Sequence, residues 1–163
     1  MAKRSISTSG LDLIKTLEGL RLHAYLCSAG VPTIGYGTTR YKGSPIRLGM
    51  VWNKKQAEDA LLEDLFEFEQ CINNRVKVKI NQKMFDSLVS FVYNVGQGNF
   101  KNSQLLKLLN QGKYEESAEE FDKWRLAKGK VVKGLIRRRQ KEKEMFLSGL
   151  CELQSEEGLN ENE

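Results

Sequence analysis

The sequence has few of the residues that mark small disulfide-linked or metal-binding proteins. Its 163 residues include one histidine and three widely spaced cysteines, Cys27, Cys71 and Cys151, with no CxxC pair. An odd, scattered set of thiols argues against a disulfide framework, and the chain has too few cysteines and histidines for a zinc site. We therefore expect reduced thiols, no metal and no other cofactor.

Long apolar runs and prolines are also scarce. No stretch approaches the length of a membrane span, and only two prolines interrupt the chain. The first ten residues carry basic side chains with no apolar run behind them, so they lack the pattern of a signal peptide. These features predict a protein without a signal peptide that stays in a cytoplasm.

Charged residues make up 29% of the chain, and the net charge is +5. A basic surface favours an anionic partner, which could be nucleic acid, a membrane face or the acidic polymers of a bacterial envelope. Charge alone does not choose among these three. The hydrophobic fraction of 40% is enough for a core, in one domain or in two small lobes.

Apolar periodicity predicts a mostly helical chain with one strand-rich segment. Leu11, Ile14 and Leu17 indicate a first helix that ends near Glu18, and the segment 23–41 is rich in strand-forming residues and glycines. Helical spacing returns after Asn53, which with Gln56 resembles a capping box. One apolar stripe follows: Ala57, Ala60, Leu61, Leu65, Phe68 and Ile72.

The same patterns give a fold class and a domain plan. We expect an α+β, mostly helical domain at 1–150, with a first helix and small antiparallel sheet at about 10–52 and a helical lobe at 77–150. A long connecting helix at 53–76 joins the two. Further helices begin near Asn81 and run from about Leu135 to Leu147, and residues 96–99 form a loop. The acidic tail at 151–163 is expected to be flexible.

Glu18 stands where the first helix meets the predicted hairpin. Glycosidic cleavage needs an acid that protonates the leaving oxygen and a second group that handles water or the charged sugar centre. A carboxyl sheltered between a helix end and a sheet is a candidate for that acid. On chemistry alone the alternative is stronger, because a single glutamate near a helix end is usually a solvated surface residue.

The segment from Glu18 to Gly37 resembles the active-site segment of phage lysozymes, glycoside hydrolase family 24. That family has Glu, then Asp nine positions later and Thr six further on, and here Glu18 and Thr33 match in register. The resemblance covers about residues 10–149. It is carried by these further segments: Thr33–Gly37, Gly49–Met50, Gln56–Ala57, Phe91–Gly96, Phe100–Ser103, Leu108–Asn110, Trp124, Gly129–Lys130 and Gly134–Arg139.

The resemblance implies a lysozyme-like fold and a bacteriolytic enzyme. A member of this family is expected to hydrolyse the β-1,4 bond between N-acetylmuramic acid and N-acetylglucosamine in peptidoglycan, with inversion and without a metal. Glu18, Cys27 and Thr33 are the implied catalytic residues. A phage-encoded version would be a monomer in the host cytoplasm that needs a holin-type protein to reach the wall.

Cys27 occupies the position where the family usually has Asp, and Cys is a known variant there. A thiol with an ordinary pKa is mostly neutral at pH 7, so a functional thiolate needs cationic neighbours or helix-end dipoles. Three readings remain open: a functional second group, a spectator beside Glu18 and Thr33, or a catalytically weakened wall-binding homologue. If Cys27 is functional, activity should rise with pH as the thiol ionises and fall as Glu18 loses its proton.

Weaker candidates for contact with the sugar lie nearby or further along the chain. They are Gly35, Tyr36, Gly37, Thr39, Asn94 and Phe100. The two glycines are also typical of strand twists or bulges, and Phe100 is equally well explained as a core anchor. Thr33 by itself would be an ordinary strand hydroxyl, and its register with Glu18 is what favours a role in catalysis.

The last predicted helix contains Arg137, Arg138 and Arg139. Interleaved glutamates and the absence of a basic-aromatic platform argue against a nucleic-acid partner and favour a solvated helix face. The family resemblance implies that one of these arginines holds the catalytic glutamate by a salt bridge. The sequence does not decide which one.

Overall fold

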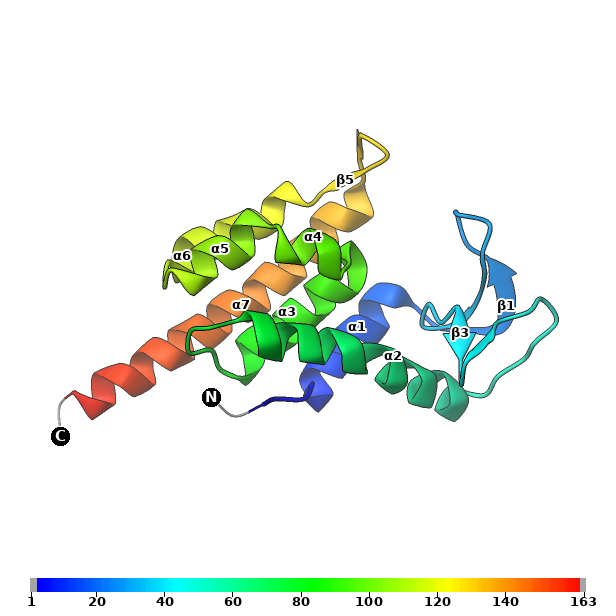
Figure 1. Cartoon of the computed structure of the whole chain (residues 1–163), viewed down its shortest axis with the longest axis horizontal. Helices are drawn as coiled ribbons and strands as arrows, with labels where there is room; N and C mark the ends of the chain where they lie inside the picture. The colour runs from blue at the N-terminus through cyan, green and yellow to red at the C-terminus, as the bar shows by residue number, and fades with distance from the viewer. Residues whose placement is uncertain (1–2, 162–163) are drawn as a thin grey trace. The chain divides into compact units, whose positions relative to one another are not determined.

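The computed structural model describes residues 3–161, and these contain seven α-helices, one short 3-10 helix and three two-stranded antiparallel sheets. The predicted fold class, α+β and mostly helical, is confirmed. In chain order (Figure 1) the elements are α1 Thr8–Glu18, β1 Arg21–Leu26, β2 Pro32–Gly35, β3 Arg40–Tyr41, β4 Ser44–Pro45, α2 Lys54–Arg75, α3 Gln82–Val95, α4 Gln97–Lys101, α5 Gln104–Asn110, α6 Tyr114–Glu120, η1 Phe121–Lys123, β5 Leu126–Ala127, β6 Lys130–Val131 and α7 Lys133–Asn160.

The chain divides into two compact units. Residues 12–67 form one, which we call the sheet unit; the described residues up to 11 and those from 68 onward form the other, the helical unit. The boundaries fall inside α1 and α2, so each of these helices contributes to both units. The predicted division at residues 52 and 77 stays a prediction.

The sheet unit is built on the β1–β2 hairpin. Tyr25 lies opposite Thr33 and Leu26 opposite Pro32, with a register shift between Arg21 and Tyr25. β3 and β4 form a second, shorter pair. The predicted strand-rich segment 23–41 therefore contributes to two separate hairpins, which together span 21–45, rather than to one sheet. Glycine turns separate the short strands.

The start of α2 shows the predicted capping box. The Gln56 backbone N–H donates to Asn53 Oδ1 and the Asn53 N–H donates to Gln56 Oε1, both at 2.8 Å. These two bonds satisfy N–H groups that a helix start leaves without partners. The predicted stripe is also confirmed, since its members are fully buried except for the half-buried Phe68.

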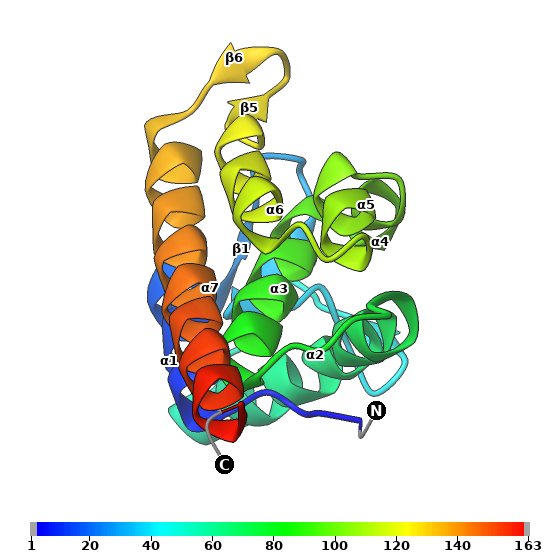
Figure 2. The same ribbon diagram turned by 90° about the vertical axis from the view of Figure 1, so that its left-hand side faces the viewer.

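The helical unit has an aromatic core. Phe85, Phe91, Phe100, Phe121 and Phe146 are each no more than 1% exposed. Phe91 meets Phe121 nearly edge to face, with ring centroids 5.2 Å apart, a geometry that aromatic pairs favour. α3 and α7 run side by side (Figure 2). They approach closely at Gly149, where a Cβ would lie 2.6 Å from Asn81 Oδ1.

Helix bounds in the helical unit differ from expectation in two places and agree in a third. α3 begins after Asn81, whose Oδ1 accepts from the Met84 N–H at 3.2 Å, so this predicted start is confirmed. The expected 96–99 loop is mostly the start of α4. α7 continues past Leu147 to Asn160 because Leu150 and Leu153 are buried and extend its apolar face.

The flexibility of 151–163 stays a prediction, and residues 162–163 of that tail lie outside the described residues, as do residues 1–2 of the predicted domain. No helix of the described residues is long and apolar enough to cross a membrane. Cys27, Cys71 and Cys151 are free thiols.

Candidate active site

Glu18 is the last residue of α1 and is half-buried. The next residue, Gly19, ends the helix: it has a φ of +74°, and its N–H donates to the Lys15 carbonyl at 2.9 Å. A left-handed glycine directly after a helix is a common stop signal because it carries no Cβ. The chain then enters β1 at Arg21, so Glu18 and the β1–β2 hairpin belong to the same unit.

Cys27 and Thr33 lie at the turn end of this hairpin. The Cys27 N–H donates to the Val31 carbonyl at 3.0 Å, and the Thr33 hydroxyl donates to the same carbonyl at 2.8 Å. Thr33 is buried, with 3% exposure, whereas Cys27 is half-buried. The hairpin register thus brings two of the three predicted catalytic residues together.

The turn itself stabilises negative charge on Cys27. The Gly30 N–H donates to the Cys27 carbonyl at 2.8 Å, which closes a tight turn, and Gly30 has a φ of +76°. Hydrogen bonds from the backbone of Val31, then of Ala29, lower the pKa of the Cys27 thiol, and the Thr33 hydroxyl contributes in the same direction. Asp at such a turn position accepts backbone N–H bonds in the same way. The thiol therefore occupies a place suited to an anion.

The cations near Cys27 in the sequence are not the cause of this shift. The Arg21 guanidinium lies over the Tyr25 ring, 4.5 Å from its centroid. His23 forms an isolated antiparallel β-bridge with Val51 through its backbone. Neither contributes to the lowered pKa of Cys27. Backbone N–H groups and a hydroxyl, rather than charged side chains, therefore stabilise the thiolate of Cys27.

Gly35 and Tyr36, at the end of β2 and just after it, are buried in the sheet unit. Gly35 is buried with a φ of +69°, and a Cβ there would lie 3.2 Å from the Ala57 Cβ and 3.3 Å from the Trp52 ring. Tyr36 is 4% exposed, and the Lys15 ammonium lies 5.9 Å from its ring centroid. Gly37 has a φ of +99° in the following turn, and Thr39 is exposed. Sugar contacts by these four residues stay predictions, and burial favours a structural role for Gly35.

Sequence reasoning missed Asp64, which supports this segment from α2. The Thr38 hydroxyl donates to Asp64 Oδ2 at 3.1 Å, and Thr38 exchanges two backbone hydrogen bonds with Ile34, each 2.9 Å long. Ile34 directly follows Thr33. Burial raises the pKa of Asp64 to about 6, although the hydrogen bond from Thr38 acts to lower it. Asp64 is one of several acidic residues on α2, and nothing in its spacing distinguished it from the others in the sequence.

Two weaker candidates lie in the helical unit. Phe100 is fully buried, and its ring centroid lies 6.4 Å from that of Phe91, which favours the core anchor over a residue exposed to sugar. Asn94 is exposed, and its Oδ1 accepts a hydrogen bond from Arg139. Its contact with sugar stays a prediction.

The arginines of α7 form a buried ionic cluster. Arg138 and Arg139 are 5% and 1% exposed, and both pair with Glu142, which is fully buried. Arg139 Nε also donates to the Trp124 carbonyl at 2.9 Å, and Arg138 donates to the Ser90 carbonyl at 3.0 Å. Arg137 is exposed. Of the three arginines, only Arg137 lies on the expected solvated face, and the pairing of an arginine with Glu18 stays a prediction.

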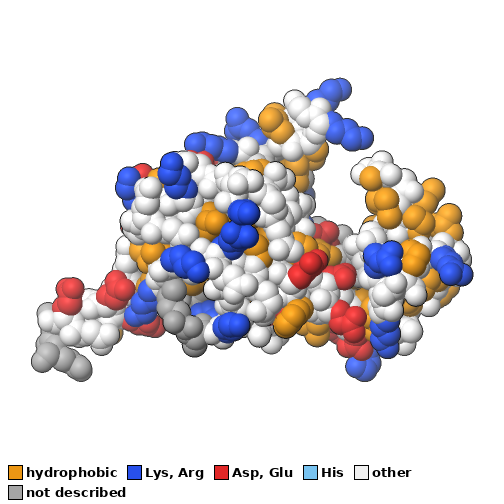
Figure 3. All heavy atoms as spheres, viewed as in Figure 1, with side chains coloured by type: hydrophobic (Ala, Val, Ile, Leu, Met, Phe, Trp, Pro, Cys, Tyr) orange, Lys and Arg blue, Asp and Glu red, His pale blue; other side chains and the backbone are white. Residues whose placement is uncertain are grey.

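Exposed basic residues also gather around the β5–β6 hairpin of the helical unit. Arg125, Lys128 and Lys130 are all exposed there, and Figure 3 shows their basic side chains at the tip. Such a cluster attracts anionic polymers. Of these three residues, Lys130 is also one of those that carry the family resemblance.

A family model described as phage lysozyme matches residues 15–142, which include Glu18, Cys27 and Thr33. The chain belongs to the phage lysozyme family. It is 45% identical over 149 residues to the endolysin of Bacillus phage PZA, an alignment that covers 88% of this chain and 55% of that protein. The chain thus spans about half the length of this relative.

Other relatives match over nearly their whole length. The chain is 45% identical over 147 residues to the endolysin of Acyrthosiphon pisum secondary endosymbiont phage 1, covering 88% of this chain and 98% of that one. The solved structure of an endolysin from Escherichia coli O157:H7 phage FAHEc1 superposes with a TM-score of 0.85 at 41% identity. That match covers 90% of this chain and 95% of the other. The lysozyme-like fold is therefore confirmed.

Proposed function

We propose that this chain is a muramidase of the endolysin type, which hydrolyses the β-1,4 bond between N-acetylmuramic acid and N-acetylglucosamine in peptidoglycan and so lyses bacteria. Membership of the phage lysozyme family and the endolysin names of its relatives support this function. The single observation that carries the proposal within the molecule is the hairpin that follows Glu18, where Cys27 and Thr33 meet at a turn suited to an anion.

In the proposed reaction Glu18 acts as the general acid. Its proton passes to the glycosidic oxygen while the bond from C1 to that oxygen breaks, and positive charge develops on the sugar ring. A water molecule on the opposite face attacks C1, which inverts the anomeric configuration. The Cys27 thiolate accepts a proton from that water, and exchange with solvent returns Glu18 and Cys27 to their starting states.

Thr33 is assigned the orientation of the water. Its hydroxyl oxygen has two lone pairs, so it can accept a hydrogen bond from water whether its one proton is donated to the Val31 carbonyl or to the Cys27 sulfur. The lowered pKa of Cys27 supports a thiolate at lower pH than an ordinary thiol allows. Together these features favour the functional reading of Cys27 over the spectator reading.

A turbidity assay on exposed bacterial walls tests the proposal. Glu18→Gln should reduce lysis about 100- to 10,000-fold, the range that general acids contribute. Lysis by the wild type that Glu18→Gln leaves unchanged would reject Glu18 as the acid. Wall binding without lysis by either protein would support the alternative, a weakened wall-binding homologue. Proton NMR of the first product anomer tests inversion.

Variants of Cys27 test its role separately. If the thiolate is the base, activity should rise with pH at a midpoint below the ordinary thiol range, because the pKa of Cys27 is lowered. Cys27→Ser should lose at least about tenfold and the rising limb with it. Cys27→Asp should keep or raise activity at acid pH. Full activity and an unchanged pH profile in Cys27→Ser would remove Cys27 from the mechanism.

The remaining expectations concern the setting of the enzyme. A monomeric state, the host cytoplasm and the need for a holin-type protein stay predictions. Size-exclusion chromatography tests the first. Expression in a host with and without a membrane-permeabilising protein tests the other two, since lysis should require both proteins.

A further inference from the structure

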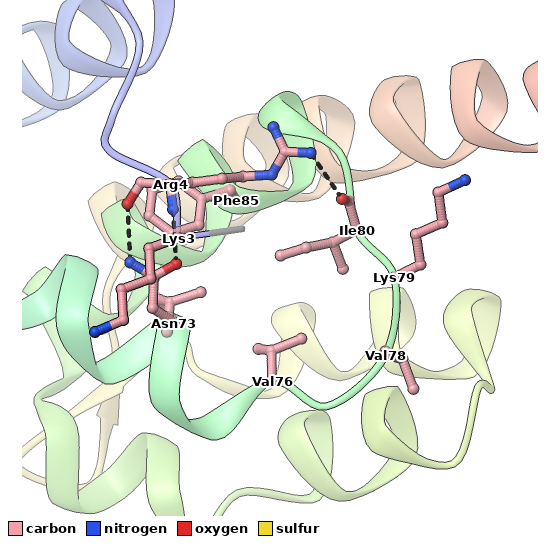
Figure 4. Close-up of a pocket in the computed structure, with 9 residues that line it drawn as sticks. Lys3, Arg4, Asn73, Val76, Val78, Lys79, Ile80 and Phe85 are labelled. Carbon is pink, nitrogen blue, oxygen red and sulfur yellow. Dashed lines mark hydrogen bonds between the residues drawn. The ribbon is translucent and has the colours of Figure 1, made fainter. Parts of the chain in front are cut away.

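The helical unit contains a pocket of about 370 Å³ that the proposed reaction does not use (Figure 4). It lies between the segment before α1, the end of α2, the segment 76–80 and the start of α3. Ile72, Val76 and Phe85 supply buried apolar surface, with exposures of 0%, 5% and 1%. The volume is within the range of small-molecule sites.

The sequence of the segment 75–80 explains how the pocket is lined. Basic and apolar residues alternate in the order Arg-Val-Lys-Val-Lys-Ile, and no helix or strand is assigned to 76–80. In extended backbone such alternation directs the two classes to opposite sides. Val76 and Ile80 point into the hollow in Figure 4, whereas the Lys79 side chain extends outward at the rim.

The wall opposite this segment is held in place by hydrogen bonds between Arg4, Asn73 and Ile80. The Arg4 N–H donates to Asn73 Oδ1 at 3.0 Å, and Asn73 Nδ2 donates to the Arg4 carbonyl at 2.8 Å. The Arg4 guanidinium donates to the Ile80 carbonyl at 3.2 Å. The Asn73 amide is engaged on both sides, and the buried side chains of the interior are apolar. The interior therefore favours an apolar chain over a hydroxyl-rich sugar.

The mouth of the pocket is cationic. Lys3, Arg4 and Lys79 are among the lining residues, and no acidic residue is. Within residues 3–161, neither Lys3 nor Lys79 has an ion-pair partner. An apolar interior below a cationic rim complements a molecule with an apolar chain and an anionic head.

We propose that this pocket binds a single-chain anionic amphiphile of the fatty-acid class, with its chain against Ile72, Val76 and Phe85 and its carboxylate at the cationic rim to which Lys3, Arg4 and Lys79 contribute. This site is independent of the glycan chemistry assigned to Glu18. It gives the helical unit a second ligand, whose chemistry differs from that of peptidoglycan.

Calorimetry with three twelve-carbon probes tests the proposal: sodium dodecanoate, dodecyl maltoside and dodecyltrimethylammonium, each below its micelle-forming concentration. The chains are matched and only the head group differs. Dodecanoate should bind roughly tenfold more tightly than the neutral probe, and the cationic probe most weakly. Equal affinities for all three, or no saturable binding of dodecanoate, would overturn the proposal.

Variants then locate the site on the folded protein, with circular dichroism as the check on folding. The double variant Lys3→Glu, Lys79→Glu should weaken dodecanoate binding roughly tenfold and leave dodecyl maltoside within about twofold. Lys77→Glu is the matched control, because Lys77 lies on the same segment but does not line the pocket; it should change neither affinity by more than about twofold. Ile80→Trp, which enlarges a side chain that points into the hollow in Figure 4, should remove binding of both probes.

A vesicle assay separates a free amphiphile from a bilayer surface. Vesicles of phosphatidylglycerol present anionic heads whose chains are already packed in the bilayer. Vesicle binding that the double variant and the Lys77→Glu control weaken in proportion to the charge each removes, without saturable dodecanoate binding, would replace the pocket by general surface attraction. Dodecanoate binding that survives Ile80→Trp would also contradict the assignment.

Discussion

The core of the helical unit and the β1–β2 hairpin of the sheet unit are stabilised by different interactions. The helical unit buries five phenylalanines at 1% exposure or less, whereas the β1–β2 hairpin of the sheet unit leaves Leu22, Leu26 and Val31 at 38%, 55% and 42%. Figure 3 shows apolar side chains on the surface of this hairpin. Side-chain packing therefore determines the helical unit, while turns and backbone hydrogen bonds determine the segment that carries Cys27 and Thr33.

Charged groups show the same contrast. In the helical unit Glu142 is fully buried between two arginines. In the sheet unit the Lys15–Glu58 and Lys55–Asp59 pairs are partly or largely exposed, and Asp64 is half-buried against a threonine hydroxyl. Removal of a charged side chain should therefore lower the free energy of unfolding most in the helical unit. A change of pH should alter stability most directly in the sheet unit, through Asp64.

The largest expected effect is loss of the aromatic core. Phe121→Ala should lower the free energy of unfolding by about 3–5 kcal/mol, since Phe121 is fully buried and packs on Phe91 and Phe146. Leu26→Ala, at a side chain 55% exposed, should cost less than about 1 kcal/mol. Urea unfolding measures both. Similar losses would break the contrast between the units.

The ionic cluster should be nearly as sensitive. Glu142→Gln leaves Arg138 and Arg139 buried without their carboxylate and should cost about 3–5 kcal/mol. Glu144→Gln is the control, because Glu144 lies two residues further along α7 and is exposed. This variant should change the free energy of unfolding by no more than about 0.5 kcal/mol. Equal unfolding free energies for the two variants would show that the buried cluster contributes nothing specific.

In the sheet unit, backbone geometry should matter more than volume. Gly35→Ala adds a Cβ at a φ of +69° and 3.2 Å from the Ala57 Cβ, and should cost about 1–3 kcal/mol. Gly43→Ala is matched in φ, at +79°, but its Cβ meets nothing within 4 Å. Its cost should therefore be the smaller of the two by urea unfolding. If both variants lose equally, contact with α2 is not what requires glycine at position 35.

The smallest effect is expected at Asp64, and it depends on pH. Its pKa is raised from 3.8 to about 6 on folding, so the folded state binds more protons between these values and ionisation costs stability as the pH rises. Asp64→Asn keeps an acceptor for Thr38 and should be more stable than the wild type at pH 7 by about 1 kcal/mol, a figure reduced for solvent screening. At pH 3.5 the two should be nearly equal.

Urea unfolding at several pH values between 3.5 and 7 measures this difference. Asp59→Asn is the control on the same helix, because Asp59 pairs with Lys55 at the surface. A stability gap between Asp64→Asn and the wild type that does not grow with pH would contradict the raised pKa of Asp64.

The sequence predicts local features of this fold well. The capping box at Asn53 and Gln56 and the helix start at Asn81 each depend on residues within a few positions, and both are confirmed. The predicted end of α7 near Leu147 was wrong, because Leu150 and Leu153 are buried only by packing within the folded unit. Tertiary burial of this kind leaves little trace in composition.

The candidate site shows the same limit. Alignment with the family pattern identified Glu18, Cys27 and Thr33. The groups that stabilise negative charge at Cys27 are mainly backbone N–H groups, and every residue except proline has one, so the sequence does not show them. Asp64 and Glu142 were missed, although the spacing of Arg138, Arg139 and Glu142 on one helix face was a signal for the latter. Their role depends on burial.

The most direct test of the account is the identity of the new reducing end released from purified peptidoglycan. The digest is reduced with borohydride and hydrolysed, and the sugar alcohols are identified by mass spectrometry. Wild type should yield muramitol, and Glu18→Gln should yield almost none. Glucosaminitol as the main product, cleavage of peptide bonds instead, or muramitol from Glu18→Gln at the wild-type rate would contradict a muramidase that uses Glu18 as its acid.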